Sequence, residues 1–348
     1  LLLTTNWATA SRADASPFQW GETTHVANAG WGRMIPLKNG RWLCVNNLYP
    51  KPNSILQLEI STDKARTWAP LTTVGETGRN LDNGEIIQLA DGTLRLTCRS
   101  VIDKRDPGAN LSYHLPVYQS ADGGKMWTFL SQIDTNEQSN FQTGQPSQGL
   151  WEPHFYLLAD GRLACAYATE KHSIETPAYS QTCALKVSPD GGKTWGPEIP
   201  LAVQPGGGNL RPGMPVVTRM ADGRFIAVYE IIGQGNGDVY QKTSPDGVSW
   251  PPGLGTFVPG QHAGPWITSL SDGRIVVTSC SNFLSYSDDF GANWQPAFPA
   301  VDVGQVFTWP AIYQTGPTEI AVMTSYHGIN IRWGRYTPRT EPKKETQK

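Results

Sequence analysis

Two glutamates are the strongest candidates for chemistry in this sequence. Glu152 lies in the segment GLWEPHF at positions 149–155, where Pro153 favours an extended conformation for the residue before it. Glu230 ends the apolar run RFIAVYE at positions 224–230, where desolvation would favour a raised carboxyl pKa. Two carboxyl groups that flank a glycosidic bond can hydrolyse it, because one protonates the leaving oxygen while the other attacks or activates water. We therefore expect Glu152 and Glu230 to form a catalytic pair, against the alternative that each pairs with an arginine or meets solvent.

The expected roles follow from the surroundings of the two glutamates. We expect Glu152 to be the nucleophile, ionised among polar neighbours near arginines, and Glu230 to be the acid/base, protonated at the end of an apolar strand. The pair should be of the retaining kind, with carboxyl groups roughly 5 Å apart. Glu170 follows a similar apolar run and is the next candidate, whereas Glu85 could serve as a salt-bridge acceptor for Arg99.

Further polar and aromatic residues could bind a sugar. Arginines can clamp an anionic substrate group or can orient carboxylates and hydroxyls, and tryptophans can stack on sugar rings or fill the core. A lone histidine is a hydroxyl contact or a structural residue more often than a metal ligand. The expected substrate-binding residues are Arg33, Arg99, Trp151, His154, Glu170, Arg211, Trp266 and Trp309. Neither a metal nor another cofactor is expected.

These residues must be positioned by a repeated structure, whose clearest unit is SPDGGKTW at positions 188–195. In this pattern the Asp side chain accepts from backbone N–H groups in a tight hairpin turn, Gly supplies positive φ, and Trp packs beside the hairpin. Near-identical copies could not all share one active site, so we interpret these units as fold staples. The other copies are at 61–68, 120–127, 244–250 and 287–294.

A second repeat consists of an apolar run, a turn and another apolar run. Its turns end at Gly40, Gly92, Gly161, Gly223, Gly273 and, in degenerate form, Gly316. Six such hairpins interleaved with five box units predict an all-β chain of six four-stranded units, a six-bladed β-propeller. We expect one domain over 1–336 and a flexible tail over 337–348.

The repeat order also predicts where a pocket lies. Both turn families should lie on one face, whereas the starts of the first strands and the ends of the second strands meet on the opposite face, near the axis. The candidate residues stand at those positions. Insertions at 103–112 and 135–150 are expected to rim the same face or the outer edge.

Composition excludes several classes of function. The net charge is −2 and the pI is about 6.3, without a basic run in the repeats, so a nucleic-acid partner is not expected. No apolar run is long enough to span a membrane, and the opening Leu1 to Leu3 is too short for a signal segment, so we expect a soluble chain. Five cysteines without C-x-x-C spacing argue against a zinc site and a disulfide framework, although one bridge remains possible.

The box pattern resembles the Asp box (BNR repeat) of sialidases and related glycoside hydrolases. Within roughly Gly30 to Tyr336 the chain is most similar to the exo-1,5-α-L-arabinanase family, through GLWEP around Glu152, RPGMP at 211–215 leading to Glu230, and TWP at 308–310. The resemblance implies a retaining enzyme that uses Glu152 and Glu230 to release arabinobiose from the non-reducing end of linear arabinan. It further implies a monomer, secreted or periplasmic, whose partner is an oligo- or polysaccharide.

The main alternative is an exo-α-sialidase, which needs an arginine triad, a Tyr nucleophile assisted by Glu, and an Asp acid/base. Arg33 begins a segment, RMIP, similar to the Arg-Ile-Pro motif with one inserted residue, and Tyr326 could be the nucleophile. No Asp outside the boxes stands convincingly in the expected early loop, so the sialidase ranks second. A non-catalytic carbohydrate-binding propeller ranks third, and a carbohydrate lyase remains open.

Overall fold

The computed structural model describes residues 16–281, 283–297 and 309–339, which form six four-stranded antiparallel sheets. Blade 1 comprises β2 (Gly30–Pro36), β3 (Trp42–Leu48), β4 (Ile55–Ser61) and β5 (Ala69–Val74). Blade 2 comprises β6 (Asn80–Gln88), β7 (Leu94–Ile102), β8 (Leu111–Ser120) and β9 (Thr128–Gln138). Blade 3 comprises β10 (Leu150–Leu157), β11 (Leu163–Thr169), β12 (Thr182–Ser188) and β13 (Ile199–Ala202), with the short helix η1 (Lys171–Ile174) after β11.

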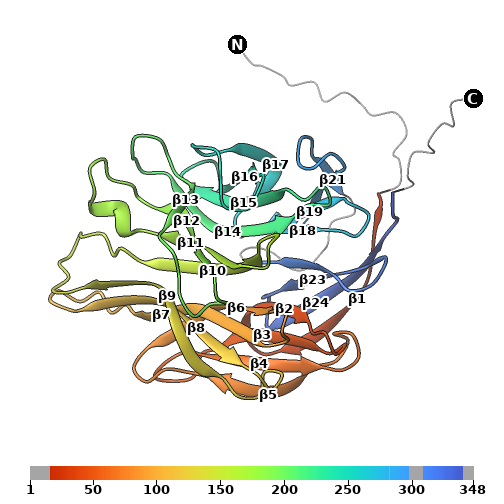
Figure 1. The fold of residues 1–348 in the computed structure, drawn as a ribbon, viewed down its shortest axis with the longest axis horizontal. Coiled ribbons are helices and arrows are strands. Elements are labelled where there is room, and N and C mark those ends of the chain that lie inside the picture. The colour runs from red at the N-terminus through yellow and green to blue at the C-terminus, as the bar shows by residue number, and fades with distance from the viewer. Residues whose placement is uncertain (1–15, 282, 298–308, 340–348) are drawn as a thin grey trace, which may run out of the picture.

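The remaining blades follow the same order along the chain. Blade 4 comprises β14 (Arg211–Arg219), β15 (Phe225–Ile232), β16 (Asp238–Ser244) and β17 (Thr256–His262). Blade 5 comprises β18 (Trp266–Ser269), β19 (Ile275–Thr278), β20 (Leu284–Ser287) and β21 (Gln295–Ala297). Blade 6 comprises β22 (Ala311–Gln314), β23 (Glu319–Thr324), β24 (Ile329–Tyr336) and β1 (Phe18–Ala27). Figure 1 shows the blades arranged as a ring, with first strands such as β10, β14 and β18 towards its middle, so the predicted six-bladed propeller is confirmed.

The ring is closed by strands from the two ends of the chain. The outermost strand of blade 6 is β1, which pairs antiparallel with β24 from Phe18↔Tyr336 to Ala27↔Ile329 (Figure 1). In blade 6 the third and fourth strands are therefore not joined by a hairpin. This explains why the sequence carries one box fewer than blades, since every box lies between the third and fourth strands of blades 1 to 5.

Each box turn is held by the side chains that the pattern repeats. In blade 3, Asp190 Oδ1 accepts from the backbone N–H of Thr194 at 2.8 Å, and Ser188 Oγ accepts from that of Gly192 at 2.7 Å. The donors around Asp190, led by the Thr194 N–H, lower its pKa to about 2. The boxes also join neighbouring blades, because Gly191 O accepts from Arg95 Nε of blade 2 at 2.6 Å. These contacts support the interpretation of the boxes as fold staples.

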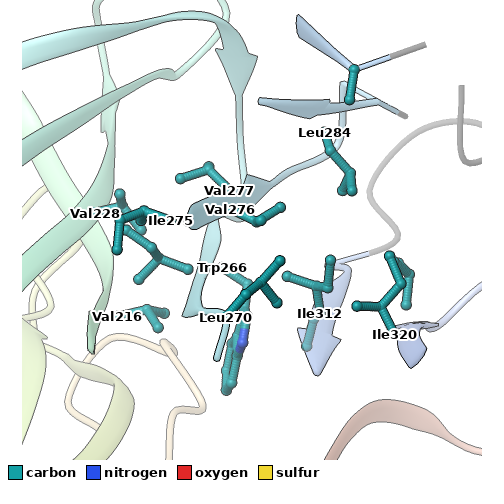
Figure 2. Close-up of a cluster of buried hydrophobic side chains, with 14 of the residues drawn as sticks. Val216, Val228, Trp266, Leu270, Ile275, Val276, Val277, Leu284, Ile312 and Ile320 are labelled. Atoms are coloured by element: carbon teal, nitrogen blue, oxygen red, sulfur yellow. The ribbon is translucent and has the colours of Figure 1, made fainter. Parts of the chain in front are cut away.

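The apolar core lies between neighbouring blades. Figure 2 shows the cluster that joins blades 4, 5 and 6, where Val228, Ile275 and Ile312 are fully buried. Burying a side chain of this size contributes about 1.5–3 kcal/mol, which makes such clusters the main force that holds the sheets together.

Several further expectations concern single residues. None of the five cysteines is bonded to another, and four of them are buried.

Residues 340–348 of the expected tail lie outside the described residues. Its first part packs on the propeller, because Thr337 N donates to Pro17 O at 2.8 Å and Arg339 Nη1 donates to Asp288 O at 2.8 Å. In the described ranges, no helix has the length and hydrophobicity that a membrane crossing requires.

Candidate active site

The first strands of the blades carry a repeated bulge near the axis. In β2, β6, β10 and β14 the pairing register slips by one extra residue between Gly30/Arg33, Asp82/Glu85, Trp151/His154 and Gly213/Val216. The first bulged residue has a positive φ in each: Trp31, Asn83, Glu152 and Met214. A bulge redirects side chains and increases local twist. The left-handed backbone of Glu152, with φ of 45°, is therefore a feature of the repeated bulge. Only its carboxyl group distinguishes Glu152 from the equivalent residues of the other three strands.

A cavity of about 780 Å³ lies where these bulges meet the ends of the second strands. Its walls come from blades 2, 3 and 4, at the end of each sheet opposite the box turns. Six of the residues singled out from the sequence line it together: Arg99, Trp151, Glu152, Glu170, Arg211 and Glu230.

Glu152 is partly exposed to this cavity and enclosed by protein elsewhere. Burial raises the pKa of its carboxyl group to about 8; Arg99 opposes the rise, whereas the negative charges of Glu230, Asp82 and Glu170 add to it. The expectation that nearby arginines keep Glu152 ionised does not hold in this structure, because desolvation outweighs the charge of Arg99.

Glu230 lies opposite Gly213 in the pairing of β14 with β15. Burial raises the pKa of its carboxyl group, while the hydrogen bond from Gly264 N to Oε2 at 2.7 Å and the charge of Arg211 oppose the rise. Both carboxyl groups are thus shifted towards the neutral form, and the charge of Glu230 adds to the shift of Glu152. The site can hold a proton near neutral pH, which general acid catalysis requires.

Glu170 is occupied by structural contacts. Its Oε1 pairs with Arg211 Nη2 at 2.7 Å, and its Oε2 accepts from Ser147 Oγ and from Gly149 N, each at 2.9 Å. Arg211 Nη2 also donates to Gln181 Oε1 at 2.8 Å. This arrangement suits a carboxylate that orients Arg211 and the strand carrying Glu152 better than one that reacts.

Arg99 is held by an aspartate that the sequence analysis missed. Asp82 faces Arg99 across the β6–β7 pairing and binds its Nη2 through Oδ2 at 2.9 Å, while Asp82 Oδ1 accepts from Asn47 Nδ2. The Arg99 guanidinium lies 4.8 Å from the Trp151 ring centroid, a cation–π contact. The sequence signal that could have identified Asp82 is the polar segment before Glu85. There the bulge adds one residue to β6 relative to β7.

A third guanidinium in the cavity, that of Arg105, was also missed. It comes from the 103–112 insertion and pairs with Asp103 through Nε at 2.7 Å and Nη2 at 3.0 Å, while Tyr113 OH donates to Asp103 at 2.8 Å. Residues 144–147 of the second insertion line the same cavity. Both insertions therefore contribute to the pocket rim.

The rest of the rim is formed by two connections that pair with each other. Tyr179 forms a bridge with Gly208, and Ser180 N donates to Gly208 O at 2.9 Å. Tyr179, Ser180, Gln181 and Asn209 line the cavity and offer hydroxyl and amide groups. The sequence carried no periodic signal for these loop residues.

Four expected substrate-binding residues are absent from the cavity lining. Arg33, His154 and Trp266 are at most 8% exposed and border a second, water-sized space of about 10 Å³ on the axis. Trp309 lies beside Trp31, with 6.1 Å between ring centroids, and its carbonyl accepts from Arg33 Nη1 at 3.2 Å. The bulge explains the difference, because Arg33 and His154 follow it and their strands converge on the axis. The described residues contain no cluster of three or more His, Cys, Asp or Glu side chains that could hold a metal ion.

Several solved structures share this fold. An α-L-arabinofuranosidase of Fusarium graminearum has a TM-score of 0.75 at 18% identity, over 91% of this chain and 98% of that one. An α-L-arabinanase of Penicillium chrysogenum, solved with arabinobiose, has a TM-score of 0.73 at 22% identity, over 92% and 96%. A sialidase of Streptococcus pneumoniae has a TM-score of 0.61 at 12% identity, over 92% and 70%. No curated protein sequence matches the chain.

The family model described as "BNR repeat-like domain" matches residues 72–322, which is more than half of the chain. This match covers four of the five boxes and the whole lining of the cavity. The box turns, the six-bladed ring and the family model agree, and the chain belongs to the BNR repeat-like domain family.

Proposed function

We propose that the protein is a retaining, exo-acting glycoside hydrolase of neutral plant polysaccharide, an exo-1,5-α-L-arabinanase that releases arabinobiose. The observation that carries this proposal is the convergence of Glu152 and Glu230, from blades 3 and 4, on one cavity where both pKa values are raised. Two carboxyl groups in one pocket are the minimum that glycoside hydrolysis requires.

The ion pairs of the pocket favour a neutral substrate. Its arginines are each matched with a carboxylate: Arg99 with Asp82 at 2.9 Å, Arg105 with Asp103 at 2.7 Å and Arg211 with Glu170 at 2.7 Å. A sialidase binds its substrate carboxylate with arginines, and such a clamp is weakened when the guanidinium groups are already neutralised. Arg33, the expected start of that triad, is 4% exposed and borders the axial space instead.

The proposed reaction divides the work between the two carboxyl groups. The ionised member attacks the anomeric carbon, while the protonated member gives its proton to the leaving oxygen, so that a glycosyl-enzyme ester forms and the remaining chain leaves as an alcohol. The second carboxylate then takes a proton from water, whose oxygen attacks the anomeric carbon, breaks its bond to the first carboxylate and so restores that carboxylate with retained configuration. Gln181, Tyr179 and Asn209 can hydrogen bond sugar hydroxyls, and Trp151 can stack on a ring.

Similar structures support the substrate class. The Penicillium chrysogenum arabinanase was solved with arabinobiose, and the structural match extends over 96% of that chain. At 22% identity the similarity concerns the fold, so the sugar must be identified by product analysis.

Product analysis tests the proposal directly. Incubation with debranched arabinan should release arabinobiose with retained anomeric configuration, while sialyl-lactose should remain intact. Double replacement of Glu152 and Glu230 by Gln provides the inactive control. Sialic acid release would establish the sialidase alternative, and binding of arabinan without turnover would establish the non-catalytic one.

Separate alanine variants assign the two roles. On an activated aryl arabinoside with azide, loss of the acid/base should give a glycosyl azide of retained configuration, whereas loss of the nucleophile should give the inverted product. Near wild-type turnover of arabinan by both Glu152→Ala and Glu230→Ala would refute the assignment.

A further inference from the structure

Beneath the pocket, the first strands bring a set of polar side chains to the propeller axis. Arg33 of β2, Glu85 of β6 and His154 of β10 are 4%, 7% and 8% exposed, and they surround the axial space of about 10 Å³. Trp266 of β18 closes this space on the blade 5 side. Glu152 lines both the axial space and the substrate cavity, so it lies between the two.

Arg33 brings a buried positive charge to this set. Its guanidinium carbon lies 4.3 Å from the Trp31 ring centroid and 4.8 Å from that of Trp266, and Nη1 donates to the carbonyls of Gly32 and Trp309. Burial lowers the Arg33 pKa, while the fields of Tyr313 and Glu85 oppose the change. A buried cation needs a compensating charge, and Glu85 is the carboxylate whose field acts on Arg33.

His154 links Glu85 to the opposite side of the ring. Its Nε2 lies 3.1 Å from Val217 O, which can only accept, so Nε2 carries a hydrogen. Its Nδ1 lies 3.5 Å from Glu85 Oε1, and within the described chain no group is hydrogen bonded to this buried nitrogen. A space of about one probe sphere is the smallest that can hold a water molecule. Beside apolar residues, this one is lined by four polar ones, Arg33, Glu85, Glu152 and His154.

We propose that Arg33, Glu85 and His154 form a positioning network that sets the charge and orientation of Glu152 through one water molecule held in the axial space. The catalytic meaning of the network rests on the proposed function, because it requires Glu152 to react. The network itself is a property of the folded chain. Other charged groups that act on Glu152 are Arg99 and Asp82 from blade 2, Glu170 from blade 3 and Glu230 from blade 4, and those around Glu85 include Tyr313 of β22 and Cys165 of β11.

Opposite charge changes provide the test. The protonation of the Glu152 carboxyl can be followed by ¹³C NMR in glutamate-labelled protein, with the signal assigned through Glu152→Gln. Glu85→Gln leaves the Arg33 charge uncompensated and should lower the Glu152 titration midpoint by about one pH unit, whereas Arg33→Gln should raise it by a similar amount. Glu85→Asp keeps the charge and should move the midpoint back towards wild type.

A control separates this network from general loss of packing. Tyr156 lies on the same strand as His154, and its hydroxyl donates a buried hydrogen bond to Gly247 O. Tyr156→Phe removes this bond without changing an axial charge, so it should leave the Glu152 titration midpoint unchanged. Shifts of the same sign in the first two variants, or none in either, would overturn the network. If only one of them folds, the sign of its shift decides. Because the titration needs no turnover, a chain without arabinanase activity would refute the proposed function and leave this test intact.

His154→Gln provides the functional readout on the natural substrate. We expect kcat to fall on the order of ten-fold with KM nearly unchanged, because the variant misplaces Glu152 without altering the pocket lining. An unchanged kcat would show that the imidazole is merely a packing group.

Discussion

Glu152 and Glu230 reach the same cavity from structurally different positions. Glu152 lies at a bulge of a first strand, among the charges of Arg99, Asp82 and Glu230, whereas Glu230 lies near the end of a second strand and accepts a backbone hydrogen bond from Gly264. Their residue types were visible in the sequence. The balance between desolvation and neighbouring charge, which decides where a proton resides, depends on the packed structure.

The pH dependence of turnover follows from the raised pKa of Glu152. If the proposed function is right, kcat/KM should fall as pH rises through about 8, because the carboxyl pair then loses the proton that the proposed reaction delivers. Arg99→Gln should move this alkaline limb to higher pH, since Arg99 lowers the Glu152 pKa. Pre-steady-state and steady-state rates measured from about pH 5 to about pH 10 locate the alkaline limb. An alkaline limb at the same pH in Arg99→Gln and wild type would contradict the effect of Arg99 on the Glu152 pKa.

At the scale of elements, the box turns and the pocket loops perform different tasks. The boxes lie at one end of the sheets and join neighbouring blades, as in the bond from Arg95 to Gly191. The connection after β11 carries Glu170, η1 and Tyr179 to the pocket at the other end. Substitutions in the two regions should therefore separate stability from activity.

Asp190→Ala should lower stability and leave the turnover of folded protein nearly unchanged. The variant loses the acceptor of the Lys193 and Thr194 N–H groups, and loss of a turn or cap bond costs on the order of 1 kcal/mol. Thermal unfolding measures the loss, with turnover measured well below Tm. An unchanged Tm combined with lost activity would contradict the structural role of the box.

The pocket connection should loosen at alkaline pH. His172 of η1 lies 2.6 Å from Glu198 and from Glu175, and the hydrogen bond to Glu198 is the main cause that raises the His172 pKa from 6.5 to about 9. The stabilisation by charged His172 is complete below about pH 6.5 and is lost as pH rises through about 9. Glu198, with a pKa lowered to about 2, stays ionised throughout.

Hydrogen exchange, corrected for its intrinsic pH dependence, can detect this change in residues 171–181. Protection of these amides should be lower at about pH 9.5 than at about pH 6.5, which lie on either side of the His172 pKa. In His172→Gln, protection should already be low at about pH 6.5. His25→Gln is the matched control, because His25 lies on β1 and contacts Asn330 of β24, away from this segment. Equal protection of the segment at both pH values would contradict this anchoring role.

At the scale of the whole molecule, closure depends on pairing between β1 and β24 (Figure 1). Phe18 of β1 is 1% exposed and belongs to the same core cluster as the strands of blades 5 and 6. Without β1, the long edge of β24 would lose its partner and expose apolar surface.

A circular permutant tests the closure. Thr337 N and Pro17 O are hydrogen bonded, so a short linker can join the two ends of the described propeller, with new termini in the exposed turn between Asn39 and Gly40. The permutant should fold with near wild-type Tm and activity. Removal of residues up to Ala27 should instead cause aggregation or a loss of many degrees in Tm. A stable, active truncated chain would show that β1 is dispensable for closure.

The repeats predicted the blade number because turn chemistry is local. Asp, Gly and Trp act within a few residues, so each box and each hairpin is legible without knowledge of the fold. The absence of a sixth box was equally visible, but its cause, the swap of β1 into blade 6, depends on contacts between residues some three hundred positions apart, such as Phe18 and Tyr336. Long-range pairing of this kind has no local signature.

For the site, five of the residues that the repeat order placed at the pocket face line one cavity: Arg99, Glu152, Glu170, Arg211 and Glu230. Their catalytic and binding roles stay predictions. Arg33, His154 and Trp266 were expected at the same cavity and lie on the axis instead, because one extra residue at a bulge and the convergence of the first strands determine which side chains are enclosed. The local chemistry of turns was thus determined by the sequence alone, whereas depth, protonation and ion pairing were decided by the tertiary structure, since desolvation and charge act through space between blades.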